Sequence, residues 1–323
     1  MKILLIEPEG RPFRSITEKQ RVQIQGLSPD IELEIVAASN AKDIEKHLEN
    51  VEVVAGIPRA LPDLSFAKKL KWVHSFSAGM DRALTSTLVQ SNVIVSNSSG
   101  IHATPIAEHI LAFLLTFTRK LQESFRNQQQ KVWERVDTLT ELRGKTVLIV
   151  GLGHIGREAA RLASCFRARV VAVDTPGKEK PEFVEQLGTT EGLAAFLKQA
   201  DFVVLALPYT RDTHHFMNKE RLEAMKQQAV LLNIGRGGVV DEQALIRVLQ
   251  EKKIGGAALD VTEKEPLSKE SPLWDMPNVV ITSHHSGISE RYMERAIELF
   301  CRNLKAYLKG EKLPNLVDKQ RGY

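Results

Sequence analysis

Six short apolar runs in the second half of the sequence constrain the fold more than any other feature. They are residues 145–150, 169–174, 201–208, 229–234, 255–261 and 278–283. β-branched and aliphatic side chains dominate each run, and each has the length of a strand rather than of a helix. Strands without an alternating polar face belong to a parallel sheet that is covered on both sides. This half is therefore predicted to be a doubly wound α/β domain.

The first hundred residues contain a second alternation of the same kind. The predicted strands are residues 2–7, 32–37, 51–56, 70–76 and 92–97, with helices at residues 43–50 and 81–90. Strands separated by helices indicate parallel βαβ packing. A chain of 323 residues is longer than one hydrophobic core usually supports, so two domains are expected. The amphipathic helix predicted at residues 290–310 is long enough to return to the first domain, which would make that domain discontinuous.

Composition argues against several classes of protein. The 44 Lys and Arg residues nearly balance the 40 Asp and Glu residues without a basic block, so nucleic-acid and membrane-surface binding are not expected. Cys165 and Cys301 lie in no disulfide or metal-ligand pattern, which indicates a reducing, cytoplasmic location and no metal site. Glu7 cuts the first apolar run too short for a signal peptide. Glu108 and His109 interrupt the most apolar later stretch, which is also too short for a membrane span.

Residues from 104 onward predict one long helix. Thr104 suits the N-cap and Pro105 the first helical position, and apolar residues continue on one face as far as Phe125. The following residues 128–145 are polar and have no clear period. They form either a linker or an arm that packs on another subunit.

The sequence Gly151-x-Gly153-x-x-Gly156 lies between a predicted strand and a predicted helix. In that context the glycines let the backbone approach a pyrophosphate at the helix N-terminus. His154 lies inside this loop and is expected to offer mainly its backbone N–H. Asp174 ends the next strand, at the distance expected of an acid that binds the adenosine ribose.

The charge of Asp174 predicts a preference for NAD over NADP, because it would repel a 2′-phosphate. Lys178 and Lys180 follow closely and could soften this preference, although they are interpreted as solvated loop lysines.

Polar side chains follow three further predicted strands. Arg236 follows residues 229–234, Asp260 and Glu265 follow the next strand, and the pair His284 and His285 ends residues 278–285. Ligands of open parallel sheets bind at the carboxyl ends of the strands. An arginine there can clamp a carboxylate, and a histidine can exchange a proton near neutral pH.

In this order the motifs resemble the D-isomer-specific 2-hydroxyacid dehydrogenases over essentially the whole chain. The matching stretches are residues 77–81 (SAGMD), 151–156 (GLGHIG) with Asp174, 231–245 (LLNIGRGGVVDEQAL), 255–267 (GGAALDVTEKEPL), 271–274 (SPLW) and 276–287 (MPNVVITSHHSG). The resemblance implies two Rossmann-like, doubly wound parallel-sheet domains with a cleft between them. Residues 1–100 and 288–323 would form the substrate domain, and residues 101–287 would bind the dinucleotide.

The resemblance also separates the two histidines. His284 takes the place of the family's catalytic histidine, with Glu265 as its partner, whereas His285 takes a position that is usually apolar. The implied enzyme interconverts a small 2-oxo acid and its D-2-hydroxy acid with NAD, NADP being less favoured. Arg236 would bind the substrate carboxylate and polarise the keto oxygen. His284, kept protonated by Glu265, would protonate that oxygen as hydride arrives.

Further site residues are carried over from the family pattern. Backbone N–H groups of Ser77, Ala78 and Gly79 would hold the substrate carboxylate, and Asp260 would contact the nicotinamide amide. The implied cofactor contacts are Thr104, Gly151, Gly153, His154, Ile155, Gly156, Asp174, Leu207, Pro208, Ile234, Gly235, Arg236, Asp260, His284 and Gly287.

Two departures from the family pattern affect the pocket but not the reaction class. Ser283 replaces the usual proline, and Thr262 stands where an aromatic residue is common. The side-chain pocket is expected to include Phe76, Met80, Ile101 and His102. Glyoxylate, hydroxypyruvate, pyruvate and bulkier oxo acids all stay open as substrates.

Three alternatives are compatible with parts of the pattern. One is a non-catalytic dinucleotide sensor like the C-terminal-binding corepressors, although no disordered tail is apparent. The second is an NADPH-preferring glyoxylate or hydroxypyruvate reductase. The third, a formate dehydrogenase-like enzyme, is disfavoured because that branch has a glutamine in place of Glu265.

The resemblance finally implies a homodimer joined through the dinucleotide domains. Trp133 lies in the polar segment and is a large apolar group that should be buried. We expect it at or near the dimer interface; the alternative is that it folds back on its own subunit.

Overall fold

The computed structural model of the chain describes all residues except 9–14, 39, 57–63, 65–66, 80–83 and 321–323. The described chain divides into two compact units. Unit 1 contains Met1–His102 and Ser289–Tyr323, and unit 2 contains Ala103–Ile288.

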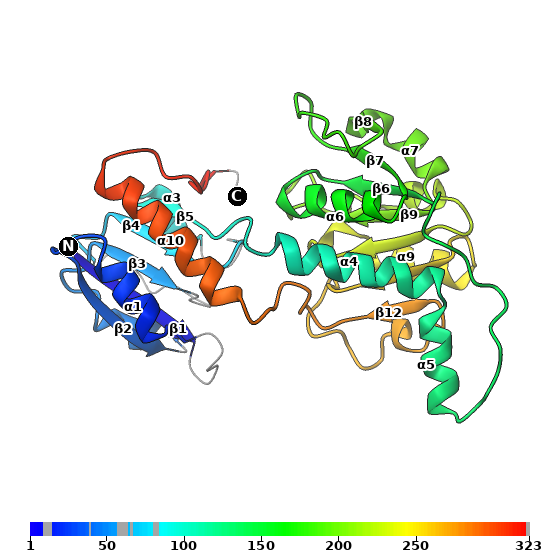
Figure 1. The fold of residues 1–323 in the computed structure, drawn as a ribbon, viewed down its shortest axis with the longest axis horizontal. Coiled ribbons are helices and arrows are strands. Elements are labelled where there is room, and N and C mark those ends of the chain that lie inside the picture. The colour runs from blue at the N-terminus through cyan, green and yellow to red at the C-terminus, as the bar shows by residue number, and fades with distance from the viewer. Residues whose placement is uncertain (9–14, 39, 57–63, 65–66, 80–83, 321–323) are drawn as a thin grey trace. The chain divides into compact units, whose positions relative to one another are not determined.

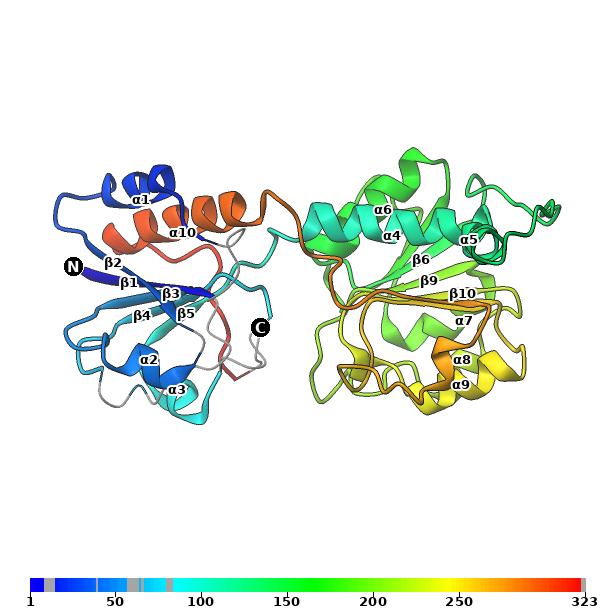
Figure 2. The ribbon, with the colours of Figure 1, turned by 90° about the horizontal axis from the view of Figure 1, so that it is seen from below.

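Unit 1 is a five-stranded parallel sheet in the order β2-β1-β3-β4-β5. Its strands are β1 (Lys2–Pro8), β2 (Glu32–Ala38), β3 (Val53–Gly56), β4 (Trp72–Ser75) and β5 (Ile94–Ser96), and its helices are α1 (Glu18–Gln25), α2 (Ala41–Glu45), α3 (Ser86–Gln90) and α10 (Tyr292–Leu308). Helices α1 and α10 cover one face, and α2 and α3 cover the other (Figure 2). The C-terminal helix therefore completes the sheet packing that the first hundred residues begin.

Aromatic side chains dominate the core under α10. Trp72 in β4 and Phe76 directly after it pack with Phe300, and all three are at most 1% exposed. Trp72 stacks on Phe300 with ring centroids 5.4 Å apart. Burial of such large apolar groups fixes α10 on the sheet.

Unit 2 is a seven-stranded parallel sheet in the order β12-β11-β10-β9-β6-β7-β8. The strands are β6 (Thr146–Val150), β7 (Arg169–Val173), β8 (Gln186–Gly188), β9 (Phe202–Leu205), β10 (Val230–Asn233), β11 (Gly256–Leu259) and β12 (Val279–Ile281). The helices are α4 (Ala103–Thr118), α5 (Leu121–Gln129), α6 (His154–Cys165), α7 (Leu193–Gln199), α8 (Lys219–Glu223) and α9 (Glu242–Gln250), with short 3-10 turns at Thr190–Gly192, Gly237–Val239 and Pro272–Trp274. Helices α4 and α6 lie on one face, and α7, α8 and α9 on the other (Figures 1 and 2).

The sheet of unit 2 changes direction of winding next to β6. The chain continues from β6 to β7 on one side, whereas β9 pairs with the other side of β6. Ligands of doubly wound sheets bind at this topological switch point. The predicted fold class, two doubly wound parallel-sheet domains, is confirmed. Strand β8 and helices α1, α7, α8 and α9 were not predicted as residue ranges.

The prediction of one long helix from residue 104 is wrong. Helix α4 ends at Thr118, and α5 begins after Lys120, whose φ of +53° is left-handed. The backbone N–H of Thr140 donates to the carbonyl of Thr118, and the Arg119 side chain donates to the carbonyl of Thr140. The N–H of Thr140 thus occupies the Thr118 carbonyl, which would have accepted a hydrogen bond from the next turn if the helix had continued.

The start of this helix also differs from the prediction. Helix α4 includes Ala103, so Thr104 and Pro105 lie inside its first turn instead of at the N-cap and first position. Proline is tolerated there because N–H groups of the first turn have no intrahelical acceptor.

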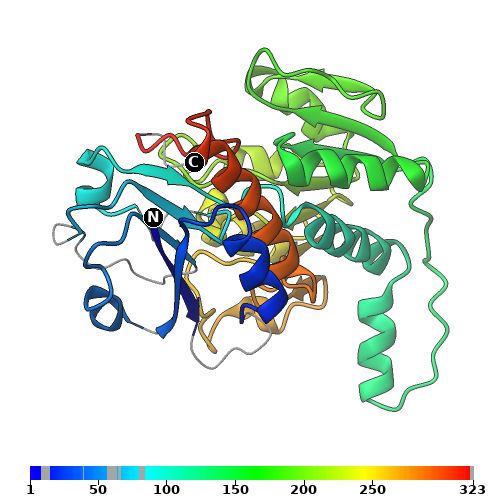
Figure 3. The ribbon, with the colours of Figure 1, turned by 60° about the vertical axis from the view of Figure 1, so that its left-hand side comes forward.

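Helix α5 and the segment after it extend away from the sheet of unit 2 (Figures 1 and 3). We call residues 119–141 the arm. Trp133 in the arm is fully exposed in the single chain, and Phe125 is 57% exposed. No helix in the described part of the chain is long and apolar enough to cross a membrane.

Candidate active site

The glycine loop of unit 2 connects β6 to α6. Gly151 has a φ of +99°, which favours glycine, and an added Cβ at Gly156 would lie 1.9 Å from the carbonyl oxygen of Gly151. A Cβ at Gly153 would instead meet no heavy atom within 4 Å. The first N–H groups of α6 have no intrahelical acceptor, so this open space at a helix N-terminus suits the pyrophosphate of a dinucleotide.

Asp174 directly follows β7, next to this loop. Its carboxylate accepts the backbone N–H groups of Leu152 and Thr175, each at 2.6 Å. These bonds hold the acid beside the glycine loop, where a ribose would follow the pyrophosphate. The Lys180 ammonium donates to the carbonyl of Val184 at 2.8 Å, so one of the two lysines that could soften a preference for NAD has a partner within the chain.

The side chains of His284 and Glu265 lie in contact. The distance between His284 Nδ1 and Glu265 Oε2 is 2.8 Å, and the two side chains are 48% and 29% exposed. With Nδ1 held by the carboxylate, Nε2 is the nitrogen that can exchange a proton with a substrate. This pairing and its spatial arrangement are what a general acid/base requires.

Asp260 holds the loop that carries His284. Its buried carboxylate accepts the hydroxyl of Thr282 at 2.5 Å and the backbone N–H groups of His285 and Ser286 at 3.1 Å each. The N–H of His284 donates to the backbone carbonyl of Asp260 at 2.8 Å. Burial acts to raise the pKa of Asp260, but hydrogen bonds from Ser286 and Thr282 outweigh it, and the pKa is lowered.

These bonds explain how His284 keeps a φ of +52°. A left-handed backbone is uncommon for a residue with a side chain and needs support from its surroundings. Ser283, at the family's proline position, lies within the same anchored loop. The loop is therefore fixed by hydrogen bonds to Asp260 rather than by a proline ring.

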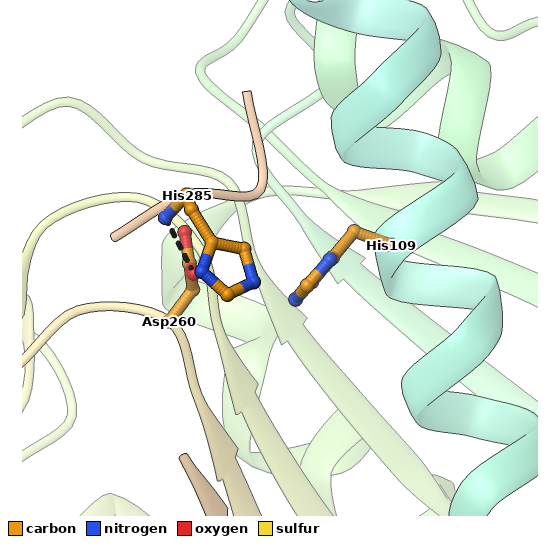
Figure 4. A group of neighbouring side chains, drawn as sticks. All are labelled: His109, Asp260 and His285. Carbon is orange, nitrogen blue, oxygen red and sulfur yellow. Dashed lines mark hydrogen bonds between the residues drawn. The ribbon is translucent and has the colours of Figure 1, made fainter. Parts of the chain in front are cut away.

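His285 lies beside Asp260 and faces His109 (Figure 4). Its ring meets that of His109 edge to face, with centroids 5.5 Å apart, and His109 Nε2 lies 3.1 Å from the hydroxyl of Thr282. Burial lowers the pKa of His109, although the charge of Asp260 opposes this effect. His109 was not predicted to lie near these residues, and its one signal in the sequence was that of a polar residue within an apolar helix.

The side chains of His109, Asp260 and His285 also place possible metal-ligand atoms within 4.8 Å of one another. The Asp260 carboxylate, however, already accepts bonds from Thr282, His285 and both the backbone and the hydroxyl of Ser286. A carboxylate has about four acceptor positions. We therefore interpret the group as a hydrogen-bonded cluster that supports the His284 loop.

Arg236 follows β10 at the carboxyl edge of the sheet. The side-chain amide of Asn233 donates to the Arg236 carbonyl at 3.0 Å, which fixes the backbone that carries the guanidinium. The next residue, Gly237, approaches Thr262 so closely that an added Cβ would lie 1.9 Å from the Thr262 carbonyl oxygen. Thr262 is buried, and its hydroxyl donates to the carbonyl of Lys264. The residue that replaces the family's aromatic group thus shapes the loop that leads to Glu265.

The other predicted cofactor contacts of unit 2 are distributed along the same edge. Thr104 is exposed in the first turn of α4, and Gly287 follows the Asp260-anchored loop. Leu207 and Pro208 follow β9, and Ile234 and Gly235 follow β10. A Cβ at Gly235 would lie 2.6 Å from the Leu207 carbonyl oxygen, so these two strand ends are closely apposed.

In unit 1 the predicted carboxylate loop follows β4. Ser77, Ala78 and Gly79 are half-buried, and among the described residues no acceptor contacts the N–H of Ala78 or of Gly79. Phe76 was expected to line the side-chain pocket, but it is only 1% exposed and packs in the core of unit 1. Ile101 is also buried, and Met80 lies outside the described residues.

Comparison with known proteins identifies the family of the chain. Residues 111–286 match the family model of the D-isomer specific 2-hydroxyacid dehydrogenase NAD binding domain. Glyoxylate reductase from Pyrococcus furiosus is 34% identical over 312 residues, which cover 92% of each chain. A D-isomer specific 2-hydroxyacid dehydrogenase family protein from Aeromonas salmonicida has a similar crystal structure, with a TM-score of 0.85, 32% identity and coverage of 98% and 99%.

A second solved structure is an NADPH-dependent glyoxylate/hydroxypyruvate reductase from Sinorhizobium meliloti in complex with NADP and sulfate. It has a TM-score of 0.84 and 28% identity, and the alignment covers 100% of both chains. The family model covers residues 111–286, and the relative and the two solved structures cover 92% or more of the chain. The chain belongs to the D-isomer-specific 2-hydroxyacid dehydrogenase family.

Proposed function

We propose that this enzyme reduces glyoxylate and related small 2-oxo acids with NADH, and that His284 is its general acid/base. The chain is an NAD(P)-dependent oxidoreductase that interconverts 2-oxo acids and 2-hydroxy acids. The curated relative from Pyrococcus furiosus is a glyoxylate reductase, which supports a small substrate. The observation that carries the assignment of His284 is its 2.8 Å contact with Glu265.

Each residue of the proposed mechanism has a separate task. Bound NADH supplies the hydride that reduces the keto carbon. Arg236 binds the carboxylate and polarises the keto oxygen, because a guanidinium pairs with a carboxylate in a bidentate manner. His284 donates the proton to that oxygen from Nε2, and Glu265 accepts from Nδ1 and stabilises the imidazolium. In the reverse reaction His284 takes the proton of the 2-hydroxyl group.

The two units would divide this work. Unit 2 carries the glycine loop, Asp174, Arg236 and the His284–Glu265 pair, and we assign it the dinucleotide. Unit 1 carries the Ser77–Gly79 loop, and we assign it the substrate carboxylate. Asp174 supports NADH over NADPH because its charge would repel a 2′-phosphate, although the relative from Sinorhizobium meliloti is NADPH-dependent.

We further propose a cytoplasmic homodimer. Both cysteines are free thiols, which supports a reducing compartment. The arm exposes Phe125, Val132 and Trp133, and a second copy of the chain is the partner that would cover them.

The test is steady-state oxidation of NADH with a panel of 2-oxo acids. We expect turnover with glyoxylate and hydroxypyruvate above that with bulkier aromatic oxo acids, and a product of D configuration where the product is chiral. A protein that binds NADH but reduces no member of the panel would be a dinucleotide sensor, and the proposal would be wrong.

A further inference from the structure

Four consecutive carbonyl groups, from the last residue of β4 into the loop after it, are held by hydrogen bonds. Ser98 holds two of them: its hydroxyl donates to the carbonyl of Ser75 at 3.0 Å, and its backbone N–H donates to that of Ser77 at 3.2 Å. Ser98 is completely buried. One neighbouring residue thus fixes two alternate peptide groups of the loop.

Tyr292 and Asn97 hold the other two carbonyls. The hydroxyl of Tyr292, at the start of α10, donates to the carbonyl of Phe76 at 2.7 Å. The side-chain amide of Asn97 donates to the carbonyl of Ala78 at 2.8 Å. Tyr292 and Asn97 are 7% and 6% exposed, so water competes little for either bond.

The N–H groups of the same loop divide into two kinds. Those of Phe76 and Ser77 donate to the carbonyl of Gly56 and the hydroxyl of Ser75. Those of Ala78 and Gly79 have no acceptor among the residues that the structure describes. Because each peptide plane is rigid, fixing a carbonyl also fixes the direction of the N–H that follows it. The bonds to Ser77 and Ala78 carbonyls therefore orient the N–H groups of Ala78 and Gly79.

We propose that Asn97 is a positioning residue that presets the N–H of Gly79 for the carboxylate of the substrate, and that Tyr292 supports it by fixing the preceding Phe76–Ser77 peptide group. This inference rests on the proposed function, in which the loop binds that carboxylate. Consecutive N–H groups that point into one concavity form an anion site, and preorganisation lowers the entropy lost on binding. Neither residue needs to touch the substrate, since both act through the loop backbone.

The C-terminal segment supports the same arrangement from a second point. The backbone N–H of Asn97 donates to the carbonyl of Asn315 at 3.2 Å, and the side-chain amide of Asn315 donates to the carbonyl of Ser99 at 2.9 Å. Both Tyr292 and Asn315 come from the part of the chain that returns to unit 1. The returning segment thus completes the anion site as well as the core.

The main test is Tyr292→Phe, which removes a single oxygen atom. Tyr307→Phe is the matched control: Tyr307 lies on the same helix and stacks on Trp72, and its hydroxyl makes no hydrogen bond among the described residues. We expect Tyr292→Phe to raise KM for glyoxylate and Ki for oxalate roughly 3- to 10-fold, the usual worth of one hydrogen bond. The Kd of NADH should be unchanged and kcat should change less than KM. Tyr307→Phe should alter none of these.

A second variant keeps the proposal testable if Tyr292→Phe does not fold. Asn97→Ala removes the bond to the Ala78 carbonyl and should raise KM and Ki in the same direction. A folded variant whose KM and Ki equal those of the wild type would overturn the inference, even if its melting temperature falls. A wild-type enzyme that reduces no 2-oxo acid would instead overturn the proposed function.

Discussion

Two alanine substitutions in the glycine loop should affect different properties: Gly153→Ala should weaken cofactor binding, and Gly156→Ala should lower stability. At Gly153 the backbone has φ −68° and ψ −169°, which alanine adopts, and the new methyl group meets no atom within 4 Å. Alanine is a poorer N-cap than glycine, which destabilises the fold, but it also lowers the conformational entropy of the unfolded chain, which stabilises the fold. Each effect on the free energy of unfolding is about 1 kcal/mol, so they nearly cancel. The folded protein should therefore keep its stability.

The same methyl group occupies the space through which a pyrophosphate would approach α6. Losing one charge-assisted hydrogen bond to the helix N-terminus costs about 1.5–3 kcal/mol, which raises the Kd of NADH roughly 10- to 100-fold. Gly156→Ala is the counterpart. Its Cβ would lie 1.9 Å from the Gly151 carbonyl oxygen and 3.0 Å from the carbonyl carbon, so the backbone itself must move. Overpacking costs about 1–3 kcal/mol, and a rigid neighbour places this variant at the upper end, or about 6–12 °C in Tm.

Thermal unfolding followed by circular dichroism and titration calorimetry with NADH measure both effects. We expect Gly153→Ala to melt with the wild type but bind NADH weakly, and Gly156→Ala to melt earlier. If Gly153→Ala binds NADH as tightly as the wild type, the dinucleotide does not approach this helix end. If Gly156→Ala is fully stable, the close approach of the two glycines is not a constraint.

Four further predictions concern single residues. His284→Asn should lower kcat by roughly two to four orders of magnitude with NADH binding retained, whereas His285→Asn should cost little; the reverse result would show that the histidines were assigned wrongly. The wild type should prefer NADH to NADPH in kcat/KM, and Asp174→Ala should reduce that ratio; a wild-type preference for NADPH would contradict the role of the aspartate. Sedimentation at micromolar concentration should give a dimer that Trp133→Ala weakens, and a 36.1 kDa species alone would exclude the dimer. Burial lowers the pKa of His74 to about 3 from 6.5, so the folded state resists protonation that the unfolded state accepts. Stability should be complete above about pH 6.5 and fall by up to about 1.4 kcal/mol per pH unit towards pH 3; urea unfolding at pH 7 and pH 5 should show a smaller loss for His74→Asn.

Local patterns were sufficient for most of the architecture. Every predicted strand is present, because unbroken apolar runs bounded by polar residues can satisfy their burial only inside a covered sheet. The glycine loop was also readable, since Gly151 has a left-handed φ and Gly156 closely approaches the Gly151 carbonyl a few residues earlier. The short strand β8 was missed because Gln186–Gly188 has no apolar run.

The end of α4 shows what local patterns do not contain. Apolar residues continue at helical spacing through Leu121 and Phe125, and no proline or glycine interrupts them. The helix nevertheless stops because Thr140, which is distant in sequence, donates to the Thr118 carbonyl. This hydrogen bond from another segment replaced the one that would have continued the helix. The spacing of apolar residues cannot predict such a contact.

The candidate site was likewise only partly predictable from the sequence. Residue types and their order were enough to place Arg236, Glu265 and the pair His284–His285 after strands, at the edge where parallel sheets bind ligands. The choice of His284 and its pairing with Glu265 came from the resemblance to the family. Only the folded chain brings His284 to 2.8 Å from Glu265. It also brings Tyr292 to the carbonyl of Phe76, 216 residues earlier in the chain. Strands and turns follow from neighbouring residues, whereas the direction of a peptide group in a loop depends on partners that only tertiary packing supplies.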